Sequence, residues 1–182
     1  TYVPLVGGMG RLRMELHANS LAEKMSRLGD GTFIPLHAPA RVSSTLVRDE
    51  LMKEESVQDA VKLMNRIDVA LVGIGYPNEH SAIKATGYYK ENEIESLVSR
   101  KAAGELCMQF YDIEGHTGPY ASDNAVIGMD IHRLCKVPCS VGIAGGKEKL
   151  SAIQGAINGK YINVLITDTE CARALLSDEE EE

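Results

Sequence analysis

Short apolar runs in this chain are followed directly by glycines. The runs are residues 3–6, 69–72 and 141–144, and the glycines after them are Gly7, Gly8 and Gly10, then Gly73 and Gly75, then Gly145 and Gly146. A run of Val, Ile and Leu without polar alternation predicts a strand buried on both faces, as in a parallel sheet. Ligands of open parallel sheets bind beyond the carboxyl ends of the strands. Glycines at those ends therefore predict an edge where bare backbone amides bind an anion.

The rest of the chain alternates between helical and strand periodicity. We expect helices at residues 20–28, 43–53, 56–65, 91–100, 130–134, 147–157 and, with its cap, 167–176, and further strands at residues 32–36, 105–111 and 161–166. In the first helix, Leu21, Met25 and Leu28 should face the core. This order predicts one α/β domain over residues 1–176, with a doubly wound, mainly parallel, Rossmann-like sheet. The acidic residues 177–182 read as a solvated tail.

The composition permits one hydrophobic core and argues against several classes of protein. Of the 182 residues, 44% are apolar and only 5% are aromatic, with no Trp, and the formal net charge is −7. Such a chain lacks the basic face and the stacking platform of a nucleic-acid-binding domain. No apolar run reaches membrane-spanning length and no leader opens the chain, so we expect a cytoplasmic protein without membrane contact. Because the sequence opens on Thr1, we also expect a segment before it.

The cysteines do not indicate a metal centre. Cys107, Cys135, Cys139 and Cys171 have neither C-x-x-C nor zinc-finger spacing. Reduced thiols in a cytoplasmic protein are the simpler interpretation. We therefore predict no metal site and no cofactor.

The glycines at residues 145 and 146 form the most specific motif. None of the glycine motifs fits a dinucleotide fingerprint or a Walker A loop, and any one of them alone can be a plain tight turn. Gly145 and Gly146, however, lead into a helix whose N-terminus favours a negative charge. Lys149 lies in the first turn of that helix, against the dipole preference for cations at the other end, which indicates an anion between Lys149 and the loop. We interpret Lys147 as a surface lysine.

Other polar residues are candidates with open alternatives. Asn19 is either part of a helix cap or a ligand for a hydroxyl group. His37, at the carboxyl end of a predicted strand, either faces the same edge or is structural. The carboxylate of Glu105 can accept hydrogen bonds from sugar hydroxyls, whereas Asp112 reads as a surface strand end. Beyond Glu105 the sequence offers no acid–base pair, so we predict no catalytic residue.

The order of these motifs resembles a known family of bacterial regulators. The matching segments are residues 4–10 (PLVGGMG), 34–40 (IPLHAPA), 68–75 (DVALVGIG), 104–105 (GE), 110–115 (FYDIEG), 141–149 (VGIAGGKEK) and 164–168 (VLITD). They look like the effector-binding, sugar-binding domain of SorC/DeoR-type transcriptional regulators, and the resemblance covers nearly the whole chain. It implies a fold like that of sugar-phosphate isomerases and CoA-transferases.

The resemblance also implies partners and a site. A phosphorylated sugar would be the effector, an N-terminal helix-turn-helix domain outside these residues would bind operator DNA, and the regulator would be a homodimer or homotetramer. By position, the glycines at residues 7, 8, 10, 145 and 146 would cradle the phosphate, and Lys149 corresponds to the family's lysine. Glu105 stands where the family more often has an aspartate that touches the sugar, and residues 76–89 would set specificity.

Two other functions fit the same residues. One is a sugar-phosphate isomerase or Schiff-base lyase that uses Lys149 as an amine nucleophile. The other is a dimerisation domain without a ligand. A basic, helix-rich segment upstream would favour the regulator over the enzyme.

Overall fold

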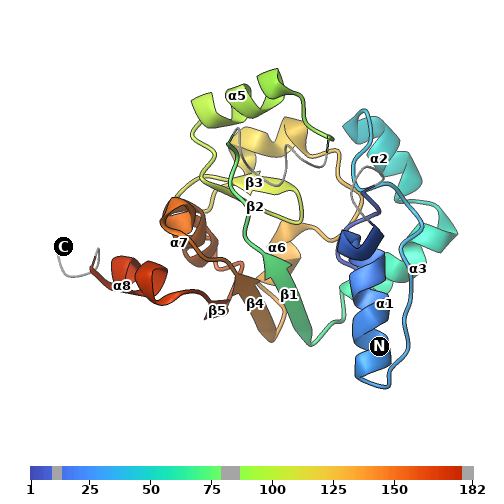
Figure 1. Cartoon of the computed structure of the whole chain (residues 1–182). Helices are drawn as coiled ribbons and strands as arrows, with labels where there is room; N and C mark the ends of the chain where they lie inside the picture. Colours follow the sequence, from blue (N-terminus) through green and yellow to red (C-terminus); the bar gives the residue numbers. More distant parts are fainter. Residues whose placement is uncertain (10–13, 79–86, 178–182) are drawn as a thin grey trace.

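Parallel strands form the central sheet of the computed structural model, which describes residues 1–9, 14–78 and 87–177. β1 (Val69–Gly73), β4 (Cys139–Ile143) and β5 (Val164–Ile166) lie in the order β1-β4-β5 (Figure 1). The register pairs Gly73 with Ile143 and Ile143 with Ile166, so these strands end side by side. This arrangement confirms the predicted α/β class and the parallel sheet.

Helices predicted from the periodicity lie close to their expected bounds. They are α1 (Ala18–Leu28), α2 (Thr45–Leu51), α3 (Glu55–Met64), α5 (Glu91–Ser99), α6 (Ile131–Leu134), α7 (Leu150–Asn158) and α8 (Thr169–Ser177), with short 3-10 helices η1 (Met14–Leu16), η2 (Gly118–Asp123) and η3 (Lys147–Lys149). Among the residues that the structure describes, every helix is too short or too polar to span a lipid bilayer.

One face of the sheet carries the main core. Ala70 and Val72 of β1 belong to a buried cluster that helices α3, α6 and α7 complete. These helices contribute Val57, Ala60, Met64, Ile131, Leu134, Ala152, Ile153 and Ala156. Apolar burial of this kind is the main driving force for packing helices onto a sheet. It fixes the positions of the strand ends that form the candidate site.

The opposite face of the sheet differs from the sequence-based prediction. Burial alternates along β1, with Val69 and Leu71 exposed. Neighbouring side chains in the same register, Ile143, Val164 and Ile166, are also exposed. The prediction of burial on both faces is therefore wrong for β1, where only the face of Ala70 and Val72 is buried, whereas it is confirmed at the centre of β4, where Ser140, Val141 and Gly142 are all buried.

A second, antiparallel pair of strands contributes a carboxylate to the site. β2 (Gly104–Leu106) pairs with β3 (Gln109–Tyr111) through a tight turn at Cys107 and Met108, which have φ values of 50° and 63°. The sequence predicted one continuous strand here, and that prediction is wrong. A two-residue hairpin turn needs this left-handed conformation, which residues other than glycine rarely adopt. The Met108 N–H donates to Glu105 Oε2 over 2.8 Å and holds the turn.

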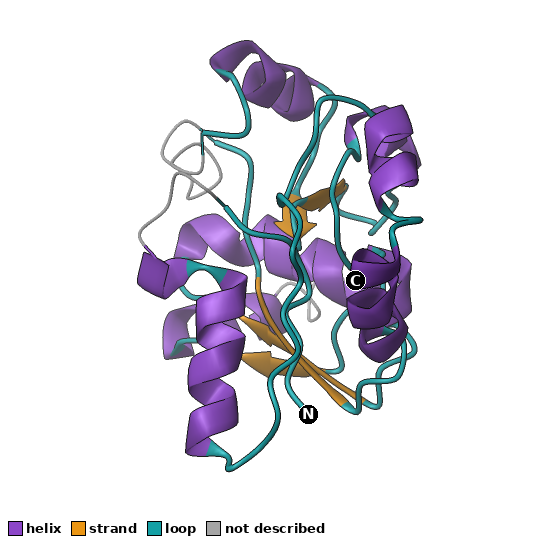
Figure 2. Cartoon of the chain, turned by 90° about the vertical axis from the view of Figure 1, so that its right-hand side faces the viewer, coloured by secondary structure: helices purple, strands orange, loops and turns teal. Residues whose placement is uncertain are grey.

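The N-terminal segment runs beside residues 33–41 as extended chain. Isolated bridges join Tyr2 to Phe33 and Gly8 to Pro39, and the two segments appear as neighbouring loops in Figure 2. The predicted strands at residues 3–6 and 32–36 form isolated bridges in place of a ladder, Val6 with Gly128 and Phe33 with Tyr2. Proline has no N–H to donate, and prolines at residues 4, 35 and 39 therefore interrupt regular pairing.

Helix α1 buries a different face from the one predicted. Its buried residues are Ala22 and Ser26, whereas Leu21, Met25 and Leu28 are exposed. The small side chains let the helix approach its neighbours closely, and the larger apolar residues then face away from them. The amphipathic pattern predicted the helix correctly but assigned its buried face wrongly.

Candidate functional site

Lys149 reaches from the end of β4 to the turn that follows β1. It is the last residue of η3, which leads into α7. Its Nζ donates to the backbone oxygen of Ile74 over 3.0 Å and lies 4.6 Å from the ring centroid of Tyr76, a cation–π distance. Lys149 is therefore partly buried at the carboxyl edge of the sheet, where the sequence predicted it.

Glu105 lies at the same turn. Its backbone forms a bridge with Gly75, in which the Gly75 N–H donates to Glu105 O over 3.0 Å and the Glu105 N–H donates to Gly75 O over 2.9 Å. The carboxylate packs so closely on Gly75 that a Cβ at this position would collide with Glu105 Oε1. A side chain at residue 75 would therefore displace the carboxyl group of Glu105, which lies directly on the Gly75 backbone.

Opposite charges and partial burial shape the chemistry of this pair. Burial raises the pKa of Glu105 to about 7, while the Met108 N–H and the positive charge of Lys149 act in the opposite direction. Burial lowers the pKa of Lys149, and the negative charges of Glu105 and Glu148 oppose that change. Near neutral pH, Glu105 is thus present in both its protonated and ionised forms, so it can donate or accept a hydrogen bond.

The Gly145–Gly146 loop is held by a residue that the site prediction missed. Gly146 has a φ of 99°, and its N–H donates to Asp168 Oδ2 over 2.7 Å. Asp168 Oδ1 accepts from the Cys171 N–H over 2.9 Å, so the same carboxylate caps α8. These amides hold the pKa of Asp168 below its usual range. In this structure the Gly146 N–H thus donates to a protein carboxylate, and the role of Gly145 and Gly146 in binding a phosphate stays a prediction.

Gly7 and Gly8 use their amides within the protein. The Gly7 N–H donates to Ile127 O over 2.9 Å, and the Gly8 N–H donates to Ala38 O over 2.8 Å. A Cβ on Gly7 would lie 2.5 Å from Pro39 O, so glycine is needed there for close backbone packing. The part that Gly7 and Gly8 play in binding a phosphate stays a prediction. Gly10 lies outside the described residues.

Asn19 binds the chain segment that carries His37. Asn19 Nδ2 donates to Leu36 O over 3.0 Å, and its Oδ1 accepts from the Leu36 N–H over 2.9 Å. The side-chain amide thereby fixes the extended segment to α1, which favours a structural role. His37 is exposed. A role for His37 in ligand binding remains a prediction.

The predicted site residues thus fall into two groups. Gly75, Glu105 and Lys149 are connected through backbone bonds and charge, and Gly73 ends the strand that leads to them. Gly145 and Gly146 lie just before η3 on the same edge. Gly7, Gly8, Asn19 and His37 belong to the N-terminal segment and its neighbour. Within the described ranges, the N–H groups of Gly7 and Gly8 and the side chain of Asn19 bind backbone atoms of other segments and do not reach Lys149.

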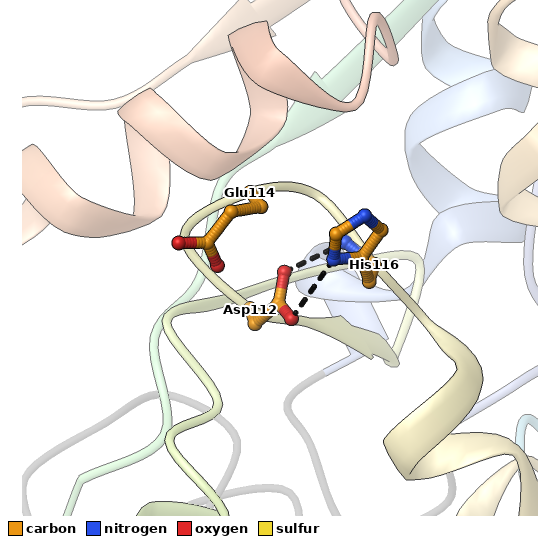
Figure 3. Close-up of side chains that lie close together, drawn as sticks. All are labelled: Asp112, Glu114 and His116. Atoms are coloured by element: carbon orange, nitrogen blue, oxygen red, sulfur yellow. Dashed lines mark hydrogen bonds and ion pairs between the residues drawn. The ribbon is translucent and has the colours of Figure 1, made fainter.

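A loop after β3 brings together side chains that could bind a cation. Ligand atoms of Asp112, Glu114 and His116 lie within 4.8 Å of one another (Figure 3). Asp112 Oδ1 accepts from the His116 N–H over 2.7 Å, and Asp112 Oδ2 lies 3.3 Å from His116 Nδ1. The contacts between Asp112 and His116 close the loop directly after β3. Asp112 therefore lies at the end of a strand, as the sequence predicted.

A cavity of about 270 Å³ opens beside β3, η2 and α6. Its lining comprises Arg48, Gln109, Phe110, Thr117, Tyr120, Ala121, Asn124, Asp130, Ile131 and His132. Several of the polar groups bind one another: Asn124 Nδ2 donates to Gln109 Oε1 over 3.2 Å, and Thr117 Oγ1 lies 2.9 Å from His132 Nε2. These contacts favour a structural role for the polar lining over ligand binding.

The fold and the Lys149 edge define a ligand-binding domain of the α/β class. Comparison with known proteins then gives the family: residues 1–177 match the family model described as "Putative sugar-binding domain". The chain belongs to this family, the sugar-binding domain of SorC-type transcriptional regulators. The resemblance inferred from its motifs is confirmed.

Named relatives are transcriptional regulators. The sorbitol operon regulator of Klebsiella pneumoniae is 33% identical over 175 residues, which are 96% of this chain and 56% of that protein. Its full-length crystal structure has a TM-score of 0.87 and 34% identity, covering 96% of this chain and 57% of that one. The deoxyribonucleoside regulator of Bacillus subtilis is 29% identical over 181 residues, 97% of this chain and 56% of that protein.

A solved domain of a Vibrio fischeri transcriptional repressor is similar as well. It has a TM-score of 0.86 and 26% identity, and the match covers 98% of this chain and 70% of that one. The chain therefore spans little more than half of the named regulators and about two thirds of this solved domain.

Proposed function

We propose that this chain is the effector-sensing part of a transcriptional regulator and binds a phosphorylated sugar, without catalysis, at the carboxyl edge of the sheet. The observation that carries the proposal is the juxtaposition of Lys149 and Glu105 on the turn at Gly75. An ammonium and a carboxylate side by side can bind the two ends of such a ligand. Lys149 would bind the phosphate and Glu105 a hydroxyl group.

The carboxylate of Asp168 determines how the phosphate would bind. The Gly146 N–H already donates to the Asp168 carboxylate. Lys149 would therefore be the principal phosphate ligand, and the glycine loop would shape the space around the phosphate. Nearby carboxylates of Glu148 and Asp168 add negative charge. A phosphate bound there would therefore depend strongly on the ammonium of Lys149.

The proposal extends to the whole regulator. A separate helix-turn-helix domain would bind operator DNA, and a homodimer or homotetramer in the cytoplasm would couple effector binding to that domain. Coupling requires that the sugar bind two states of the regulator with different affinities. The named relatives, which are operon and nucleoside regulators, support this assignment.

Isothermal titration calorimetry tests the site. We would titrate the chain with glucose 6-phosphate and fructose 6-phosphate, and with the two unphosphorylated sugars. Lys149→Met should weaken binding of the phosphorylated sugar at least about tenfold, as expected for loss of a charge-assisted hydrogen bond. Lys147→Met is the matched control, because Lys147 is exposed and pairs with exposed Glu170 over 3.6 Å. Equal binding by both variants, or equal binding of both sets of sugars, would contradict the proposal.

One observation favours a second candidate, an enzyme that forms a Schiff base. Burial lowers the pKa of Lys149, which increases the fraction of neutral, nucleophilic amine. The amine would condense with an open-chain aldehyde and release water. Borohydride trapping followed by mass spectrometry separates the two functions: a reduced adduct on Lys149 supports the enzyme, and an unmodified chain that still binds sugar phosphate supports the sensor.

A further inference from the structure

The carboxylate of Glu148 lies over the backbone of the loop at Gly145 and Gly146. Its oxygens would lie 2.5 and 2.6 Å from a Cβ on Gly146, which is closer than real side chains allow. Glu148 is an exposed residue, so its side chain has solvent to rotate into. An acidic group therefore fills the space next to the backbone that the second glycine of this motif leaves free.

Two carboxylates approach this loop, but only one of them is anchored. Asp168 accepts from the Gly146 N–H over 2.7 Å and from the Cys171 N–H over 2.9 Å. Among the residues that the structure describes, by contrast, no hydrogen bond or ion pair holds the carboxylate of Glu148. Moving Asp168 would break bonds to two backbone amides, whereas Glu148 can rotate away without breaking any. Glu148 is therefore the movable acid of the loop.

The same carboxylate acts on the charge of Lys149. The backbone N–H of Lys149 donates to Gly146 O over 2.9 Å, so both residues belong to one tight turn that also carries Glu148. Burial lowers the pKa of Lys149, and the negative charges of Glu105 and Glu148 oppose that change. A phosphate monoester has about −1.5 to −2 charges near neutral pH. A phosphate bound to this ammonium would thus meet a like charge on Glu148, and the two would repel each other.

We propose that Glu148 determines how much negative charge the ligand site accepts: its carboxylate takes the place beside Gly146 that a phosphate needs, and a phosphorylated ligand binds by displacing it. This inference rests on the proposed function, since it requires a phosphate at Lys149. An unfavourable contact of this kind is a general way to make a site selective. A sugar without a phosphate leaves Glu148 in place, so the residue lowers affinity for phosphorylated sugars alone. The sensor then responds at a higher effector concentration.

Titration calorimetry of a neutral variant tests this competition. In about 20 mM NaCl, Glu148→Gln should bind glucose 6-phosphate or fructose 6-phosphate at least about fivefold more tightly than the parent protein, because one repulsive charge is gone. Binding of the two unphosphorylated sugars should change less than about twofold. In about 500 mM NaCl the gain should fall below about twofold, since salt screens exposed charges.

Glu170→Gln is the matched control. Glu170 lies on α8, is exposed and pairs with Lys147 over 3.6 Å, so this substitution changes the net charge equally without clearing the space over Gly146. It should change sugar-phosphate affinity less than about twofold. An equal gain in both variants would overturn the proposal, because net charge alone would then explain the gain.

The titrations also separate this proposal from the proposed function. Equal binding of the sugar phosphates by the parent and by Glu148→Gln, with weaker binding by Lys149→Met, would refute the role of Glu148 and leave the proposed function standing. Binding that Lys149→Met does not weaken would instead contradict the proposed function, and this inference with it.

Amine reactivity gives a readout that needs no bound sugar. In competitive labelling with acetic anhydride at about pH 8, Lys149 should react about twofold faster in Glu148→Gln than in the parent, because the charge that raises its pKa is gone. Exposed Lys62 of α3 serves as the internal reference, and Glu170→Gln should leave the rate at Lys149 unchanged. The same rate in Glu148→Gln and the parent would rule out a carboxylate acting on this ammonium, whether or not a sugar binds.

Discussion

Gly7 and Gly75 both follow short apolar runs, yet a side chain at each position would collide with a different kind of neighbour. At Gly7 the neighbour is backbone, with Pro39 O and Ala38 O within 2.6 Å of where a Cβ would lie. At Gly75 the neighbour is the carboxylate of Glu105, a side chain that can rotate away. The first glycine serves packing and the second serves a charged site. An identical sequence signal therefore marks two different kinds of close approach.

The largest expected effect is on the stability provided by the first of these turns. Gly7→Ala should destabilise the fold by about 3 kcal/mol, because the methyl group collides with two backbone oxygens that cannot move independently. Gly8→Ala is the matched control: the nearest atom to a Cβ at residue 8 is Ala38 O at 3.8 Å, an ordinary contact. Urea unfolding of both variants measures the difference. Equal stabilities would show that the N-terminal segment can adjust freely.

A substitution in the second turn, at Gly75, should weaken ligand binding more than it lowers the stability of the fold. Gly75→Ala should displace the Glu105 carboxylate and weaken binding of the phosphorylated sugar at least about tenfold, while the free energy of unfolding falls by about 1 kcal/mol. Gly73→Ala provides the control, since no atom lies within 4 Å of a Cβ there. Titration calorimetry and urea unfolding, run on the same samples, separate the two quantities. A variant that binds normally would remove the Gly75 turn from the site.

The protonation of Glu105 should make stability depend on pH. Burial raises its pKa from 4.5 to about 7, so the folded protein holds this proton more tightly than the unfolded chain. Its effect on stability therefore becomes less favourable as pH rises from 4.5 to 7 and is constant above that range. Glu105→Gln should be close to the parent in stability at pH 4.5 and exceed it by up to about 3 kcal/mol at pH 8. A pH-independent difference between the two proteins would contradict the assignment.

The smallest effect is expected at Asp168. Its pKa is depressed by the Cys171 and Gly146 amides, so its stabilising contribution is present above the ordinary value of 3.8 and is lost as pH falls through the folded value. Asp168→Asn should slightly lower the Tm at pH 7 and not at pH 2. Because a neutral amide can still accept from Gly146, sugar-phosphate affinity should change by less than about threefold. A larger loss of affinity would give Asp168 a direct role in binding.

Local sequence signals predicted much of this fold. Apolar runs identified β1 and β4, and the end of the predicted strand at residues 161–166 became β5. The placement of Lys149 at the carboxyl edge followed from parallel topology alone. Its direct contacts with Ile74 O and the Tyr76 ring depend on where a distant turn ends, which no local pattern reports.

The errors have a common physical origin. Leu21, Met25 and Leu28 formed a convincing apolar stripe, but close approach through Ala22 and Ser26 decided which side of α1 is buried. Residues 105–111 looked like one strand because nothing at Cys107 or Met108 signals a left-handed turn. Asp168 was identified as part of a helix cap, while its second bond to Gly146 is a tertiary contact. Each error arose where packing overrode a local preference.

The hydrogen bond from the Met108 N–H to Glu105 Oε2 ties the shape of a hairpin to the charge at the candidate site. A shorter acid at residue 105 would keep the negative charge but withdraw from the amide, and the conformation at Cys107 and Met108 would lose its brace. The position of the charge at residue 105 and the geometry of the hairpin therefore change together. A change of acid at residue 105 would therefore also reshape the loop that follows it.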